Sequence, residues 1–163
     1  MVEVEHPNRE KASSKAMKAA VILLLLVSAL LIAVITAGGW SELQGAQPVA
    51  FAYFVLYLVM AFYVTRWNRG VLPVAAALAI LFAVIAAVAG PAWFERDKAG
   101  FEEPAVDPAT LGMLTVILVP VQLMLMAECM RAFSQKWNVE VEVRRGSHPP
   151  PDARGRGAEP AGA

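Results

Sequence analysis

Four long apolar runs, separated by polar segments, dominate the hydropathy pattern of the chain. They cover residues 19–38, 48–64, 71–90 and 110–131, and the third of them contains no charged or hydroxyl side chain. An apolar run of about 20 residues is long enough to cross the hydrocarbon core of a bilayer as one helix. The pattern therefore predicts an all-α integral membrane protein with four transmembrane helices.

The polar segments divide the rest of the chain. Residues 1–18 form an N-terminal segment, and a transmembrane domain follows over residues 19–138. A basic segment before an apolar run also occurs in secretory signals, but this run exceeds the 7–15 apolar residues of a typical signal core. We therefore interpret it as a retained helix. The tail, residues 139–163, is rich in Pro, Gly, Ala and Arg after residue 146, where we expect disorder.

Basic residues predict the orientation. Twelve of the fourteen Lys and Arg residues lie before the first run, between the second and third runs, or at and beyond the end of the fourth. The other two, Arg96 and Lys98, lie in the acidic loop of residues 91–109. Because basic residues concentrate in cytoplasmic segments, we expect both termini in the cytoplasm and this loop outside it.

One tryptophan follows each apolar run. They are Trp40, Trp67, Trp93 and Trp137, and tryptophans at helix ends are typical anchors in the headgroup region. The sequence Arg-Trp-Asn at residues 66–68 also resembles Lys-Trp-Asn at residues 136–138. Two interpretations stay open: two tandem helical hairpins related by duplication, or recurrence of these residues for interfacial reasons alone.

Small residues recur at helical spacing in two of the runs. They are Ala29, Ala33 and Ala37 in the first run, and Ala75, Ala79, Ala83 and Ala87 in the third. Such smooth faces let helix backbones approach closely within lipid. We expect the two faces to be helix-packing surfaces and to suit one another. In the second run Tyr53, Tyr57 and Met60 share a face, which favours packing over the alternative of a quinone or lipid ring.

The fourth run carries the polar side chains that could perform chemistry. Gln122 lies near its middle, Glu128 near its end, and Pro120 predicts a kink that would free the Val116 carbonyl. An intramembrane carboxylate is a functional hypothesis, here for proton or cation binding. The alternative interpretation pairs Glu128 with Arg131, three residues further along, and gives Gln122 an interhelical hydrogen bond.

Two flanking segments also carry local patterns. Aromatic and charged residues alternate in the loop of residues 91–109, which predicts a short amphipathic surface helix, and Asp107 followed by Pro108 predicts the start of the fourth helix. Residues 2–5 and 139–143 both alternate Val with Glu, as short strands do. Pairing them is disfavoured unless the register keeps glutamates from facing one another.

Composition limits the function classes. The chain is 58% hydrophobic and has one cysteine, Cys129, which excludes an internal disulfide. Its two histidines, His6 and His148, lie in the polar tails, so a bis-histidine haem within the membrane is not available from this chain. We find no catalytic constellation and no metal or cofactor motif, and we expect no nucleic-acid partner.

These observations favour a non-enzymatic protein of the bacterial inner membrane. Its usage of Ala, Val, Gly and Arg is typical of GC-rich coding. The favoured hypothesis is an accessory or assembly subunit of a larger complex, in contact with the bilayer and with a membrane-protein partner or further copies of itself. The alternative is a small oligomeric transporter or channel that uses Glu128 and Gln122 on a kinked fourth helix.

Overall fold

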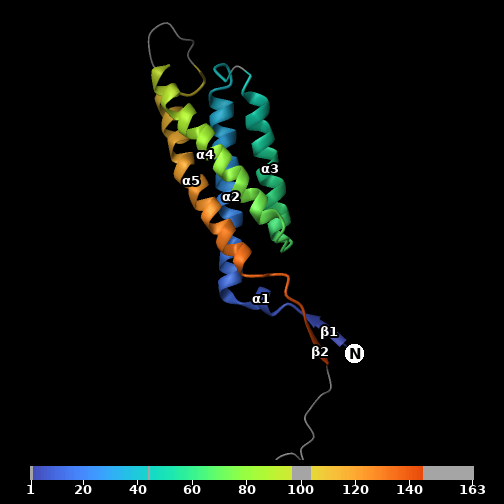
Figure 1. The fold of residues 1–163 in the computed structure, drawn as a ribbon. Coiled ribbons are helices and arrows are strands. Elements are labelled where there is room, and N and C mark those ends of the chain that lie inside the picture. The colour runs from blue at the N-terminus through green and yellow to red at the C-terminus, as the bar shows by residue number, and fades with distance from the viewer. Residues whose placement is uncertain (1, 44, 97–103, 145–163) are drawn as a thin grey trace, which may run out of the picture.

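Long helices make up most of the computed structural model, which describes residues 2–43, 45–96 and 104–144. The elements follow in the order β1 (Val2–Glu5), α1 (Pro7–Glu10), α2 (Ala12–Gly38), α3 (Gln47–Thr65), α4 (Val71–Glu95), α5 (Pro108–Ser134) and β2 (Val141–Arg144). Helices α2 to α5 lie side by side, and α1 and both strands lie beyond one end of them (Figure 1).

The four long helices confirm the predicted membrane-protein architecture. They contain 27, 19, 25 and 27 residues and are each apolar enough to cross a membrane. At 1.5 Å per residue even α3 spans about 28 Å, close to the thickness of the hydrocarbon core. Large apolar side chains such as Leu30, Phe51, Val88 and Met124 point outward from all four. The orientation of the termini and the duplication of a hairpin stay predictions.

Two helix ends differ most from the predicted boundaries. Helix α2 begins at Ala12 because its polar first turns continue the apolar helix without a break. Helix α4 continues through Pro91 to Glu95, where we expected a loop with a separate surface helix. Pro91 removes only the hydrogen bond to the Ala87 carbonyl, and the extension buries Trp93 to 3% exposure. Residues 97–103 of that loop, and the tail after residue 144, lie outside the described residues.

At the start of α5 the prediction is confirmed. Asp107 is the N-cap, and its Oδ2 accepts a hydrogen bond of 2.9 Å from the backbone N–H of Thr110. Pro108 occupies the first turn, where its missing N–H costs no intrahelical bond. The helix then runs through Pro120 to Ser134.

Helix packing differs from the pairing expected of the two alanine faces. Helix α4 packs chiefly on α5, while α2 packs on α3 and α5, and α3 and α4 touch least of these pairs. A Cβ added at Gly90 would lie 2.8 Å from Val116 Cγ2, so glycine allows the close approach of α4 to α5. The main neighbour of α4 is therefore α5, and not α2 as the two alanine faces predicted.

The alanine stripes themselves are buried only in part. Ala75, Ala79 and Ala83 are buried, but Ala87 is exposed. On α2, Ala29 is buried, Ala33 is intermediate and Ala37 is exposed. In an α-helix, a step of four residues turns about 40° more than a full rotation. Residues spaced by four therefore leave the buried face within three steps. Ala87 and Ala37 are therefore not packing residues within the bundle.

The two terminal segments form an antiparallel ribbon. Val2 pairs with Arg144, Glu3 with Val143, Val4 with Glu142 and Glu5 with Val141. The observed register meets the condition that the sequence set for this pairing, because every glutamate of β1 lies opposite a valine. The ribbon places residues 2–5 and 141–144 together beyond one end of the helices (Figure 1).

Candidate functional site

A buried polar group ties three helices together at the centre of the bundle. Gln122 on α5 is fully buried. Its Oε1 accepts a hydrogen bond of 2.6 Å from the hydroxyl of Tyr57 on α3, and its Nε2 donates one of 3.0 Å to Oγ of Ser28 on α2. Because buried polar atoms are costly when they lack partners, this arrangement fixes how α2, α3 and α5 face one another.

Aromatic rings surround this group on one side. Tyr53 and Tyr57 meet edge to face with ring centroids 5.8 Å apart, and Phe82 of α4 lies 4.5 Å from the ring of Tyr53. Tyr53, Tyr57 and Met60 are all buried. The aromatic stripe of α3 thus packs inside the protein, as the favoured interpretation of the sequence had it.

Glu128 and Arg131 lie near the C-terminal end of α5 and pair with one another. Arg131 Nη1 is 3.2 Å from Glu128 Oε1, and the two side chains are 69% and 23% exposed. Glu128 is about 9 Å further along the helix than Gln122 and about 120° around it. The structure therefore does not bring Gln122 and Glu128 together on one face.

The thiol of Cys129 is buried and free. Among the described residues, no group of three or more His, Cys, Asp or Glu side chains is placed to hold a metal ion. In the part of the chain that the structure describes, the side-chain hydrogen bonds that join different helices therefore lie mainly in two places: at Gln122 and at the helix ends.

Three basic side chains bond to carbonyls at the ends of α3 and α5 or just beyond the end of α5. Lys18 Nζ donates to the Thr65 carbonyl at 2.8 Å, Arg69 Nε to the Phe133 carbonyl at 2.8 Å, and Arg9 Nε to the Trp137 carbonyl at 2.9 Å. The last carbonyls of a helix have no intrahelical partner and carry partial negative charge. Some of the basic residues that predict the orientation thus also cap helices.

Two tryptophans meet at this same end. The rings of Trp67 and Trp137 are 5.2 Å apart in a T-shaped arrangement, and Lys18 Nζ lies 4.1 Å over the ring of Trp67. Trp67 has φ 61°, the left-handed conformation that closes the C-terminal turn of α3. Its N–H bonds to the Val64 carbonyl, and the next N–H bonds to that of Tyr63.

Burial corrects the prediction that all four tryptophans are interfacial anchors. Trp137 is fully buried and Trp93 is 3% exposed, so both pack within the protein. Trp67 is intermediate, and Trp40 is 60% exposed. A position at a helix end suggests exposure at the membrane surface, but packing against other helices buries these two rings. Only Trp40 and Trp67 have the accessibility that an anchor needs.

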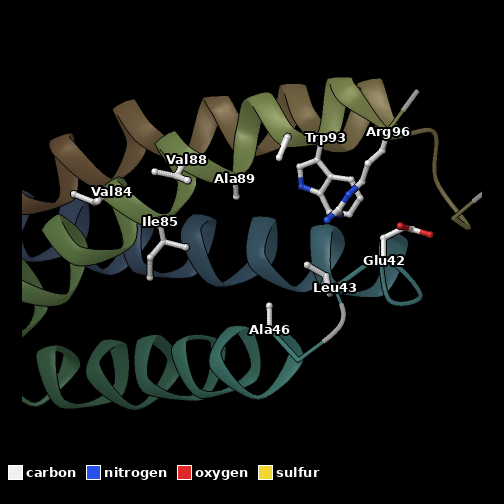
Figure 2. A pocket seen from close by; sticks show the side chains of 10 residues that line it. Glu42, Leu43, Ala46, Val84, Ile85, Val88, Ala89, Trp93 and Arg96 are labelled. Atoms are coloured by element: carbon white, nitrogen blue, oxygen red, sulfur yellow. The ribbon is translucent and has the colours of Figure 1, made fainter. Parts of the chain in front are cut away.

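A cleft that the sequence did not predict lies beside α4, at the end of the bundle remote from β1 and β2. Its volume is about 900 Å³, and its walls come from the α2–α3 loop and from the second half of α4 (Figure 2). The lining residues are Glu42, Leu43, Ala46, Val84, Ile85, Val88, Ala89, Ala92, Trp93 and Arg96. The hydropathy pattern places Trp93 and Arg96 in a surface loop, so it gives no signal for this cleft.

The cleft depends on the placement of Trp93. A Cβ added at Gly39 would lie 2.4 Å from Cη2 of the Trp93 ring, so the ring occupies space that only glycine leaves. Arg96 lies one turn further along α4, with its guanidinium carbon 5.0 Å from the centre of that ring. This stacking holds the arginine beside Trp93, at the end of the cleft where Glu42 lies (Figure 2).

Together, the fold and these contacts define the class of protein: a small polytopic protein whose four long helices suit a lipid bilayer. Comparison with models of protein families, with curated proteins and with solved structures gave no match.

Proposed function

We propose that this protein is a non-enzymatic accessory or assembly subunit of a larger complex in the bacterial inner membrane. The observation that carries the proposal is the closed hydrogen-bonding of Ser28, Tyr57 and Gln122. Since these buried groups satisfy one another's hydrogen bonds, we infer that the polar groups inside the bundle hold the helices together. The protein then acts through its outer surface, by contact with another membrane protein.

Helix α3 offers the most suitable surface for such a contact. It has the smallest buried share of the four long helices. Phe51, Val55, Leu58 and Phe62 are exposed along one side of it, at spacings of four, three and four residues. Side chains at these spacings share one helical face. An apolar face of this kind suits a helix of a partner, or of a second copy.

The orientation that we propose has both termini in the cytoplasm. The basic residues before α2, between α3 and α4 and after α5 support it. The pairing of β1 with β2 is a further support for one common side, because the segment before α2 and the segment after α5 must then lie together. Single cysteines introduced near each terminus in a Cys129→Ala background should react with a membrane-impermeant thiol reagent only after the cells are opened.

The transporter alternative requires a polar path through the bundle. Gln122 is engaged on both sides of its amide, and Glu128 lies on another face in an ion pair with Arg131. These contacts support the subunit proposal over the alternative. A flux measurement on Glu128 separates the two and is given in the Discussion.

Native purification followed by mass spectrometry tests the subunit proposal. Val55→Trp places a bulky ring on the outer face of α3, and Ile117→Trp places one on α5 at a similarly exposed position, the two native side chains being 39% and 43% exposed. We expect the parent and Ile117→Trp to co-purify with one partner in constant ratio, and Val55→Trp to lose it. A parent chain that migrates alone in mild detergent would contradict the proposal.

A further inference from the structure

The cleft beside α4 has the form of a lipid site. Helices α3 and α4 are joined by the short turn of residues 66–70, and they make the fewest contacts among the packed pairs of long helices. Away from that turn the cleft opens to about 900 Å³, within the size range of ligand sites. Val84, Ile85 and Val88 form an apolar wall along α4 (Figure 2).

A second, smaller cavity extends the cleft towards the core. Its volume is about 120 Å³, and it shares Leu43, Ala46, Ile85, Ala89 and Trp93 with the cleft. Its deeper wall is apolar and includes Leu118 of α5. The apolar part of the site therefore runs inward from the side of the bundle.

Opposite charges stand at one end of this apolar surface. Glu42 and Arg96 both lie at the end of the cleft beyond Trp93 (Figure 2). The ion pairs among the described residues are Lys15 with Glu10 and Arg131 with Glu128, so neither Glu42 nor Arg96 is paired with another described residue. Arg96 instead stacks on the Trp93 ring. The cleft thus presents one cation and one anion next to a long apolar wall.

We propose that the cleft binds one phospholipid with a zwitterionic amino headgroup, such as phosphatidylethanolamine. Arg96 binds its phosphate, Glu42 accepts hydrogen bonds from its ammonium group, and one acyl chain lies along Val84, Ile85 and Val88. Charge-assisted hydrogen bonds of this kind are among the strong polar contacts. The headgroup and the acyl chain of such a lipid are adjacent, as are the charged end and the apolar wall of the cleft.

A transmembrane helix of a partner fits this site less well. An apolar helix laid along Val88 would cover Glu42 and Arg96 without supplying charges to either, and burial of an unpaired charge is costly. The lipid site is separate from the outer face of α3 proposed above for a partner. Each proposal can therefore fail without the other.

Native mass spectrometry of the intact protein tests the proposal. The protein is reconstituted in nanodiscs with equal amounts of phosphatidylethanolamine and phosphatidylglycerol, released into mild detergent, and the retained lipids are counted. We expect one phosphatidylethanolamine per chain. Ala89→Phe fills the cleft and should abolish retention, whereas Ala87→Phe, on the exposed side of the same helix, should preserve it.

Charge variants test the headgroup contacts. Arg96→Gln should weaken retention of both lipids about tenfold, as the loss of one charge-assisted hydrogen bond does. Glu42→Gln should remove the preference for phosphatidylethanolamine and leave phosphatidylglycerol unaffected. Arg66→Gln, at the opposite end of the bundle, is the matched control and should behave as the parent does.

Photo-cross-linking with a phosphatidylethanolamine analogue that carries its reactive group in the acyl chain provides a readout without release from the membrane. Labelled peptides should come from residues 84–93 in the parent and disappear in Ala89→Phe. Equal labelling and equal lipid counts in Ala89→Phe and Ala87→Phe would overturn the proposal. A polypeptide cross-linked to the cleft in place of lipid would overturn it as well.

Discussion

Tyr57 on α3 donates a hydrogen bond of 2.6 Å to the side-chain carbonyl of Gln122 on α5, where both side chains are fully buried. The amide of Gln122 donates in turn to Ser28 on α2. Three helices that are distant in the sequence thus share one polar contact point, and the packing of the bundle depends on it.

Loss of either partner should therefore destabilise the bundle. Hydrogen bonds between membrane helices contribute about 0.6–2 kcal/mol, and we expect Tyr57→Phe and Gln122→Leu each to lower the free energy of unfolding by about 1 kcal/mol. The double variant should lose less than the sum, because the two side chains serve one contact. Unfolding in sodium dodecyl sulfate followed by circular dichroism measures this, with the exposed Tyr63→Phe as control. Additive losses would contradict the coupling.

Gly39→Ala should destabilise the end of the bundle that carries the cleft. The added Cβ would lie 2.4 Å from Cη2 of Trp93, and overpacking of this kind costs about 1–3 kcal/mol. The backbone itself accepts alanine, since φ of Gly39 is −108°. Thermal unfolding in detergent should show a lower midpoint. Trp93→Phe removes the obstructing ring atom, so adding it should restore part of the loss; an unchanged midpoint in Gly39→Ala would contradict the packing.

Arg69 and Arg66 should differ although both belong to the same basic turn. Arg69 bonds to the Phe133 carbonyl and lies 3.9 Å over the Phe133 ring, whereas exposed Arg66 lies 5.4 Å over that of Phe62. Arg69→Gln should reduce the free energy of unfolding by about 1–2 kcal/mol, and Arg66→Gln by less than about 0.5 kcal/mol. Equal effects in the unfolding assay would mean that Arg69 acts only through its charge.

Glu128→Gln tests the transporter alternative directly. The ion pair with Arg131 is largely exposed on the arginine side, and exposed pairs contribute at most about 1 kcal/mol. We expect little change in stability. In proteoliposomes under a proton or cation gradient, we expect the parent and the variant to give the same flux as empty vesicles. A flux that the parent supports and Glu128→Gln abolishes would favour the transporter and count against the subunit proposal.

Several parts of the site could be read from the chain, and others could not. Gln122 stood out because an amide in a long apolar run must find a partner, but nothing in the spacing identified Ser28 and Tyr57 as its partners. Asp107 was predictable because a helix N-cap is set within four residues. Arg96 and Glu42 are separated by more than fifty positions, so their common place at the cleft follows only from how α4 packs.

The sequence by itself determined the four apolar helices, because the length and composition of each run decide locally whether a helix can cross a bilayer. It also determined the cap at Asp107. Tertiary structure alone decided that α4 packs on α5, that Trp93 and Trp137 are buried, and that the two terminal strands pair in a register without facing glutamates. Each of those outcomes depends on how the surfaces of segments far apart in the sequence fit together. Hydropathy does not specify which of the helix faces that carry small residues pack on one another.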